Sequence, residues 1–506
     1  MYLKRQKNTQ NGHISFKIFE KISGREKLIK HLGTAKNEDE IKDLERLAIQ
    51  AIGDIKSERN LPLFPKDHSR LVDIEKISIK NISVVGLHDI FGHVYDEIGF
   101  GLLGNTLLRD LVIGRIGFPG SKLKTCDYLF YYCGILMNPD NIYRFMDSLT
   151  DSKKEQVSTI SAGYVTGLEK EIISLVFFDV TTLHFEAFDE DDFRKMGFSK
   201  VGKFNQPQVV VALLVTSRGI PLAYESFEGN KFEGHTLVPV LNMFKKRLNL
   251  AKLVVVADSA MLSKKNLEEL EKNNYEYILG GRIKNEKKDM QKQIWEKVNE
   301  KDSLCEFSRG EQRLIVGYSL SRAAHDAKNR ERAIKRLQKR IDAGDNPAFS
   351  NAGARKFLQN QNTQKAEIDQ DKIDRDKKWD GLKGYVTNSK SLTPTEVLSS
   401  YGNLWQIEKD FRMSKTDLLA RPIFHFRQRR IKAHLCLVFV ALVVGKVAEI
   451  KTGVSVRKMT ELLKLVRAVT IYDKISKQEF VLTTEISADQ RKIYEAVGVK
   501  LPGKHF

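Results

Sequence analysis

The feature that most constrains this chain is an alternation of apolar strands and helices between residues 172 and 285. The runs IISLVFFDV, QVVVALLVT, IPLAYESFEG, KLVVVAD and YEYILGG are rich in β-branched and aromatic residues, as buried strands are. Helices with an apolar stripe are predicted between the later runs, over residues 236–248 and 264–273. An alternation of this kind predicts an α/β fold.

Two aspartates accompany these predicted strands. Asp179 lies inside the apolar run LVFFDVTTL, and Asp258 follows KLVVVA directly. Burying an unpaired carboxylate is costly, and polar residues near strand ends of α/β sheets are where sites form. A hydrogen-bonded structural aspartate is the alternative for either residue taken alone. On neighbouring strands, the two together predict a site for a hard divalent cation such as Mg²⁺.

A third acid, Glu408, lies in the segment YGNLWQIEKDFRMSKTDL, which has the period of a helix. At about 100° per residue, one predicted face carries an acid, two cations and two aromatic residues. These residues are Tyr401, Trp405, Glu408, Arg412 and Lys415. An ordinary amphipathic helix with solvated charges is the alternative interpretation.

Phosphoryl transfer on DNA is the chemistry that needs such a set. Two divalent ions about 3.5–4 Å apart clamp the attacking and leaving oxygens, and carboxylates hold the ions. Arg412 and Lys415 would hold the phosphate beside the cut. Tyr401 and Trp405 would stack on a base or pack on the DNA backbone.

Around these residues the chain resembles the transposases of bacterial insertion sequences. Tyr401, position 404, Glu408 and Lys415 have the spacing of the Y-(2)-R-(3)-E-(6)-K signature of one large superfamily. Leu404 stands where that signature has Arg, and Arg412 is the candidate to replace its phosphate contact. The blocks DVTTLHFE, PQVVVALLV, GIPLAYESFEGN and VVADSAMLS are also similar, so the resemblance covers residues 86 to 450.

The resemblance implies a ribonuclease-H-like mixed-sheet catalytic core with an insertion domain. It implies that Asp179, Asp258 and Glu408 are catalytic metal ligands for Mg²⁺, which Mn²⁺ can replace, with two ions per site. The implied partners are double-stranded DNA, both the transposon's terminal inverted repeats and the target, and further copies of the chain. These copies would form a homodimer or higher oligomer in the synaptic complex.

The chain is expected to divide into six regions. The two parts of the core are expected to hold the catalytic acids, with the helical region before them and the insertion domain between them. The expected regions are a basic N-terminal DNA-binding arm or domain (1–85), a mostly helical DNA-binding region (86–165), the first part of the core (170–285), the insertion domain (286–394), the second part of the core with the Glu408 helix (395–450) and a C-terminal region that is a candidate for dimerisation (451–506).

Charge supports a polyanionic partner. The formal net charge is +19 and residues 1–30 carry eight Lys or Arg against two Asp or Glu, so nucleic acid is the first candidate and an anionic membrane the second. Residues 1–30 are predicted to form a hairpin that contacts DNA, with a solvated edge hairpin as the alternative. Lys200 and Arg282 are further candidates for contact with the DNA backbone.

No membrane partner is expected, because the longest apolar run, Leu435 to Val444, has ten residues and a membrane span needs about 20. This run is predicted to be a buried helix. The four cysteines form no C-x-x-C pair and the N-terminal residues lack an apolar stretch. These features favour the bacterial cytoplasm, with association with the nucleoid when DNA is bound.

Three other functions were weighed against a catalytic transposase. A haloacid-dehalogenase-like phosphatase needs a second Asp two residues after the first, and position 181 is Thr. A repair or junction nuclease also uses metal-bound acids, but such enzymes are much smaller and lack the Tyr–Glu–Lys pattern. An inactive or domesticated transposase that acts as a DNA-binding regulator is the remaining alternative, and Leu404 is the feature in its favour.

Overall fold

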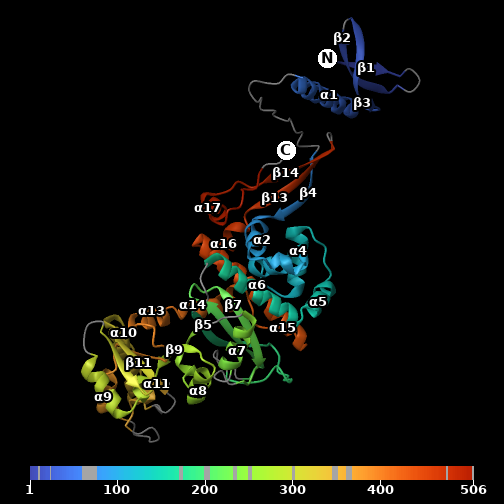
Figure 1. The fold of residues 1–506 in the computed structure, drawn as a ribbon. Coiled ribbons are helices and arrows are strands. Elements are labelled where there is room, and N and C mark those ends of the chain that lie inside the picture. The colour runs from blue at the N-terminus through green and yellow to red at the C-terminus, as the bar shows by residue number, and fades with distance from the viewer. Residues whose placement is uncertain are drawn as a thin grey trace.

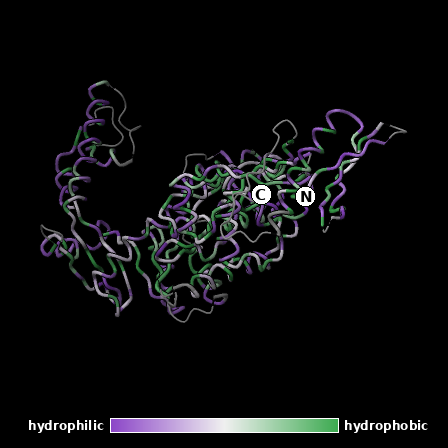
Figure 2. Tube along the Cα trace, turned by 90° about the horizontal axis from the view of Figure 1, so that it is seen from above, coloured by the Kyte–Doolittle hydropathy of each residue, from purple (hydrophilic) through white to green (hydrophobic). Residues whose placement is uncertain are grey.

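The computed structural model describes most of the chain, with short gaps between elements. The described residues are 1–8, 12–22, 24–59, 77–169, 175–198, 205–231, 236–248, 253–298, 303–344, 352–359, 367–474 and 477–503. Figure 1 shows a body built around one large sheet, with the N-terminal unit at one extremity and the helix α10 (Leu320–Asp342) near the other. Figure 2 shows that hydrophobic residues concentrate in this body.

The N-terminal unit is a small sheet covered by one helix. The strands β1 (Tyr2–Lys7), β2 (Ile14–Ile22) and β3 (Arg25–Ala35) pair antiparallel in that order, and α1 (Glu38–Arg59) packs against them. Residues 37–58 carry Ile41, Leu44, Leu47, Ala48 and Ala51 at the spacing of one helix face, which predicts the amphipathic helix that α1 confirms. The predicted hairpin gains a third strand, because β3 pairs along the whole of β2.

The central sheet has eight strands in the order β10-β11-β12-β9-β8-β5-β6-β7. Five of them, β7-β6-β5-β8-β9, combine antiparallel pairing of β5, β6 and β7 with parallel pairing of β5, β8 and β9. Their bounds are β5 Leu175–His184, β6 Gln208–Thr216, β7 Pro221–Glu228, β8 Val254–Ala257 and β9 Glu276–Gly281. This is the mixed sheet expected of a ribonuclease-H-like core, so the predicted fold class is confirmed.

Helices cover the sheet on several sides, which explains why its strands are apolar throughout. All nine residues of β6 are buried, and a strand buried on both faces has no reason to alternate polar with apolar residues. The helices in contact with the strands are α6 (Asp151–Glu169) on β7, α8 (Lys264–Lys272) on β9, α14 (Trp405–Arg412) on β5 and β6, and α15 (Gln428–Thr452) on β7.

The helix α15 is the centre of a helical layer formed with α2 (Gly86–Ile98), α3 (Thr106–Gly117) and α5 (Pro139–Ser148). Within the described residues, it is the one helix long and apolar enough to span a membrane. Its most apolar window is 89% buried inside the protein. The prediction that Leu435–Val444 forms a buried helix is therefore confirmed.

The segment 286–394, expected to interrupt the α/β layer, instead extends the central sheet. The strand β12 (Leu382–Thr387) pairs antiparallel with β9, and the hairpin of β10 (Leu304–Arg309) and β11 (Gln312–Tyr318) continues from β12. The helices α10, α11 (Ala352–Arg355) and α12 (Gln370–Lys377) lie outside the sheet, around a small apolar cluster that includes Leu337 and Phe357.

The last strands of the chain pair with a strand near its start. The strands β13 (Arg467–Asp473) and β14 (Gln478–Thr483) form a three-stranded sheet with β4 (Ile77–Val84). The expected N-terminal region (1–85) and C-terminal region (451–506) are thus joined by backbone hydrogen bonds of β4 with β13. The remaining helices are α4 (Lys122–Cys133), α7 (Leu237–Leu248), α9 (Lys288–Lys297), α13 (Pro394–Gly402), α16 (Val456–Leu463) and α17 (Ala488–Val497).

Candidate active site

Asp179 and Asp258 lie side by side because of the register between β5 and β8. These strands are parallel, and Phe177 pairs with Val256. Asp179 and Asp258 each follow their paired residue by two positions, so Asp179, inside β5, lies level with Asp258, which directly follows the last residue of β8. Adjacent strands are about 4.8 Å apart. The sequence prediction that the two aspartates are neighbours therefore agrees with the pairing.

Asp179 is half-buried, and the Val180 backbone N–H donates to its Oδ1 at 2.7 Å. Two residues further along β5, the hydroxyl of Thr181 accepts a hydrogen bond from Lys415 Nζ. Residues i and i+2 of a strand point to the same face. Lys415 therefore places a cation on the face of β5 that carries Asp179.

Asp258 begins the loop that leaves β8. Its carboxylate accepts a hydrogen bond from the Ala260 backbone N–H at 2.8 Å, which fixes the first turn after the strand. The guanidinium of Arg282, just after β9, donates to the backbone oxygen of Ser259 at 2.7 Å. Arg282 is exposed and so remains open to an anion while anchored to the Asp258 loop.

Tyr401 lies between the second and third acids. It is buried at the end of α13, and burial together with the negative charges of Asp258 and Glu408 raises its pKa to about 12. Its hydroxyl fits against β9 because position 280 is glycine: a Cβ there would lie 2.6 Å from the Tyr401 oxygen and 3.1 Å from Ser259 N. Tyr401 thereby packs against β9 beside the loop that starts at Asp258.

The single helix predicted through Glu408 is wrong in two places. A turn at Asn403 and Leu404 separates α13, which ends at Gly402, from α14, which begins at Trp405. After Arg412 the chain forms a π-helical turn, Met413–Asp417. Such a turn is rare and is frequently found at functional sites. The apolar spacing continues through both irregularities, so periodicity alone does not reveal them.

The shared face predicted for five residues holds for three of them. Trp405, Glu408 and Arg412 lie on α14 at positions i, i+3 and i+7, and all three are exposed. Tyr401 belongs to the preceding helix and is buried, whereas Lys415 lies in the π-helical turn and reaches β5. The acid, the indole and the guanidinium therefore face solvent together.

Leu404, at the position of the signature arginine, is 7% exposed and packs in the main core. A different cation lies near Glu408. Lys383 on β12 is half-buried, and its ammonium nitrogen lies 4.4 Å from the centre of the Tyr401 ring. Burial and the nearby Arg322 lower the pKa of Lys383, whereas Glu408 raises it. Lys383 and Arg322 both belong to the segment 286–394, which was expected to be an insertion, so the sequence did not predict either residue as part of the site.

Asp179 and Asp258 form a neighbouring pair, and Glu408 comes from the separate helix α14. Among the described residues, no three His, Cys, Asp or Glu side chains form a ready-made metal cluster. The donors are nevertheless carboxylate oxygens, which hard divalent ions such as Mg²⁺ and Mn²⁺ prefer. The residues present therefore fit a divalent metal by chemistry.

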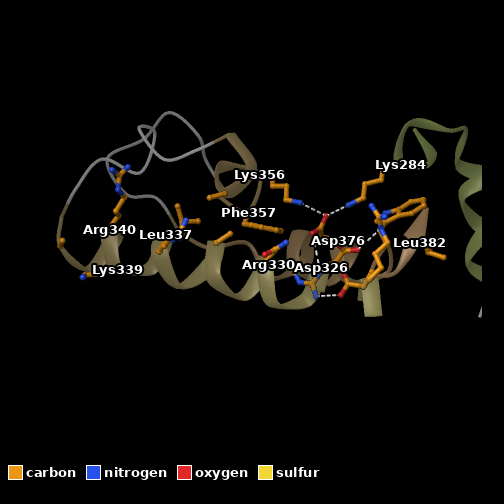
Figure 3. A pocket seen from close by; sticks show the side chains of 18 residues that line it. Lys284, Asp326, Arg330, Leu337, Lys339, Arg340, Lys356, Phe357, Asp376 and Leu382 are labelled. Carbon is orange, nitrogen blue, oxygen red and sulfur yellow. Dashed lines mark hydrogen bonds and ion pairs between the residues drawn. The ribbon is translucent and has the colours of Figure 1, made fainter. Parts of the chain in front are cut away.

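A cavity of about 840 Å³ lies outside this site, along α10, α11 and α12. Figure 3 shows Asp376 between Lys284 and Lys356, and the two Nζ atoms lie 2.8 and 2.9 Å from its Oδ1. Arg330 pairs with both oxygens of Asp380 at 2.5 Å. Lys284 lies two residues after Arg282, which is bonded to Ser259 beside Asp258. The ion pair of Lys284 with Asp376 therefore attaches α12 to the segment next to Asp258. Lys200 falls outside the described residues.

Comparison with known proteins places this geometry in context. A family model described as "Transposase DDE domain" matches residues 171–444. No curated protein sequence matches the chain.

Among solved structures, the cryo-EM structure of a piggyBac transposase synaptic complex with hairpin DNA is 9% identical with a TM-score of 0.37, covering 74% of this chain and 70% of that one. The Mos1 mariner paired end complex with Mn is 9% identical with a TM-score of 0.15, covering 31% and 54%. The Mos1 transposase paired-end complex with left transposon end is 10% identical with a TM-score of 0.16, covering 47% and 66%.

Proposed function

The chain belongs to the transposase DDE domain family, since the family model spans more than half of it, and on that premise we propose that Asp179, Asp258 and Glu408 are its catalytic acids. As a transposase, the protein is an enzyme that cleaves and joins DNA. The observation that carries the proposal is the register of β5 and β8, which aligns Asp179 with Asp258. The negative charges of both Asp258 and Glu408 raise the pKa of the buried Tyr401, which supports Glu408 as the third acid.

The proposed cofactor is Mg²⁺, replaceable by Mn²⁺, with two ions held by the three carboxylates. When bound, such ions activate the attacking oxygen and offset charge on the phosphate. The chain's own residues position the DNA. Lys415, held on Thr181, would contact the phosphate on the Asp179 side, and Lys383 would contact it on the Glu408 side.

Arg412 and Trp405 extend the proposed site along the exposed face of α14. The Trp405 side chain is 50% exposed, which is unusual for so large an apolar group and suits stacking on an unpaired base. Arg412 would bind a phosphate one helical turn beyond Glu408. Arg282 would do the same beside Asp258, where its anchor on Ser259 limits its movement.

The proposed partners are duplex DNA of the transposon's terminal inverted repeats, target DNA, and a second or further copy of this chain. The net charge of +19 supports DNA binding that weakens as salt rises. The proposed location is the bacterial cytoplasm, with association with the nucleoid through DNA. The C-terminal region remains the candidate for contact between copies.

A DNA-binding regulator without catalysis is the second candidate, because Leu404 replaces the signature arginine. A cleavage assay separates the two functions. A labelled duplex carrying the transposon's terminal sequence is incubated with Mg²⁺ or Mn²⁺ and either the wild type or Asp258→Asn. We expect the wild type and Asp258→Asn both to bind the duplex, and the wild type alone to cleave it. Binding without cleavage by the wild type in either metal would favour the regulator.

A further inference from the structure

The N-terminal unit separates its charges between the sheet and the helix. Residues 1–35 contain eight Lys or Arg and two Asp or Glu, whereas Glu38 to Ile55 of α1 contain six Asp or Glu and two Lys or Arg. Three of the acids form the first turn of α1. A polyanion is therefore attracted by the sheet and repelled by the helix.

The two faces of the sheet have different residues. Phe16 and Ile18 on β2 are fully buried and face α1, and Arg5 on β1 reaches the same side to pair with Glu45. Because side chains alternate along a strand, Lys17 lies on the opposite, open face. In Figure 1, α1 covers one face of β1–β3 only.

The open face carries two rows of polar side chains across the three strands. In the first row Lys4 pairs with Lys17, and Lys17 pairs with His31. In the second row Gln6 pairs with Ser15, which pairs with Thr34. The members are partly or fully exposed. Lysine, glutamine, serine and threonine are residues that hydrogen-bond to base edges in DNA.

Contacts within these rows hold the side chains over the sheet. Lys17 Nζ donates to Gln6 Oε1 at 2.9 Å, and Ser15 Oγ lies 2.8 Å from His31 Nε2. At the other end of the face, Lys4 pairs with Glu26 at 2.6 Å. Pre-ordered side chains lose less conformational entropy when they bind a partner. The face is therefore arranged for specific contacts as well as for charge.

We propose that the open face of β1–β3 lies in the major groove of duplex DNA and reads base edges through Gln6, Ser15, Lys17 and His31. The major groove is about 12 Å wide and admits a two-stranded β-ribbon, and the axes of the three strands span about 10 Å, which is within that width. In this orientation α1 faces away from the DNA, where its acids meet no phosphate. The identity of the DNA, a terminal repeat of the transposon, rests on the proposed function.

The test measures binding of the full chain in the Asp258→Asn background without divalent metal, so that it does not depend on cleavage. Two duplexes of equal length are compared, one with the terminal repeat and one with the same bases scrambled. The Gln6→Ala/Lys17→Ala double variant removes one side chain from each row. Its matched control, Lys42→Ala/Gln50→Ala, removes the same residue types from the exposed part of α1.

We expect Gln6→Ala/Lys17→Ala to weaken binding to the terminal repeat about tenfold to a hundredfold, since each base contact contributes about 1–3 kcal/mol of discrimination. Binding to the scrambled duplex should fall far less, and the control should preserve the preference for the repeat. Thermal unfolding of both variants checks that the fold is kept. If Gln6→Ala/Lys17→Ala unfolds the N-terminal unit, Ser15→Ala/His31→Ala takes its place. This second double variant should show the same loss of binding to the terminal repeat.

Groove assignment comes from methylation interference on the terminal repeat. Methyl groups at guanine N7 lie in the major groove and should block binding, whereas methyl groups at adenine N3 lie in the minor groove and should not. An unchanged preference for the repeat in both sheet variants, an equal loss in the α1 control, or interference confined to the minor groove would overturn the proposal. A wild type that binds both duplexes equally would overturn it as well. Binding without cleavage by the wild type in Mg²⁺ or Mn²⁺ would instead count against the proposed catalytic function and leave this proposal standing.

Discussion

The ammonium nitrogen of Lys383 lies 4.4 Å from the centre of the Tyr401 ring. The contact joins β12, at the start of the sheet extension, to the end of α13, which immediately precedes the Glu408 helix. A cation over an aromatic face is held electrostatically, and the attraction increases where water is excluded. Lys383 is therefore the cation best placed to act in place of the arginine that Leu404 replaces.

Replacement of Lys383 by Met is expected to reduce strand cleavage about a hundredfold, as removal of a charged group at a reacting phosphate does. DNA binding should change little. Lys383→Arg should retain most activity.

Because burial lowers the pKa of Lys383, its side chain loses its positive charge at a lower pH than an exposed lysine does. Cleavage by the wild type should fall as pH rises through that pKa, and the fall should move to higher pH in Lys383→Arg. The exposed Lys390→Met is the matched control; equal cleavage by Lys383→Met and Lys390→Met would rule out this role.

Neutralising the acids tests the site directly. Asp179→Asn, Asp258→Asn and Glu408→Gln are each expected to abolish cleavage while binding to the terminal repeat survives, since metal ligands serve chemistry more than docking. Glu268→Gln on the exposed face of α8 is the control. Cleavage that persists in any one variant would remove that residue from the site.

Gly280 permits the close approach of Tyr401 to β9, so Gly280→Ala should displace the Tyr401 side chain and thereby disturb the site. Its Cβ would lie 2.6 Å from the Tyr401 hydroxyl. We expect a loss of about 1–3 kcal/mol in the free energy of unfolding, typical of overpacking, together with reduced cleavage. Tyr401→Phe removes the clashing oxygen and should restore part of the lost stability. A double variant no more stable than Gly280→Ala would show that the backbone of Ser259 causes the strain.

Leu404→Arg restores the signature residue and yet is expected to be harmful. Leu404 is 7% exposed and belongs to the main hydrophobic core, so an arginine there would bring a charge among apolar side chains. Burial of an unpaired charge should lower the free energy of unfolding by several kcal/mol, about 3–5 when such a charge has no partner. Denaturant unfolding and the cleavage assay measure both effects. Increased cleavage at unchanged stability would mean that position 404 can reach the DNA.

Asp410 gives the stability of the core a specific pH dependence. It is fully buried beside Lys446, and burial raises its pKa from 3.8 to about 7, although Lys446 opposes the shift. Between these values only the folded state holds the proton, so the free energy of unfolding should fall as pH rises, by at most about 1.4 kcal/mol per pH unit. Above the folded pKa the loss should stop.

Asp410→Asn should flatten this dependence between pH 4 and 7, because the amide does not titrate. Denaturant unfolding at several pH values is the measurement. The exposed Asp374→Asn, on α12, serves as the control and should leave the slope unchanged. An unaltered slope in Asp410→Asn would assign the pH dependence to another group.

Local sequence patterns predicted the core strands well because each strand is a buried apolar run. The run QVVVALLVT coincides with β6, and the period of residues 37–58 predicted α1 within one residue at either end. The neighbouring positions of Asp179 and Asp258 also followed, since both acids accompany strands of one layer. What these predictions share is that each strand or helix can be recognised from its own consecutive residues.

Features that depend on distant pairing were not predictable in this way. Nothing in the run LKGYVT shows that β12 pairs with β9 across about a hundred residues, so Lys383 was not placed near Glu408. The turn at Asn403 and Leu404 preserves the apolar spacing, which made two helices look like one. The π-helical turn around Lys415 is invisible for the same reason.

The pairing of β4 with β13 also sets an order of events during synthesis. Within the described residues, β1, β2 and β3 pair with one another and α1 packs on β2 and β3, so this unit can fold as soon as it leaves the ribosome, as N-terminal domains do. The strand β4 follows it directly, but its partner lies nearly four hundred residues later. A nascent chain can thus present a finished DNA-binding face while its catalytic half is still being translated. DNA close to the translating ribosome is therefore the first that the N-terminal unit can meet.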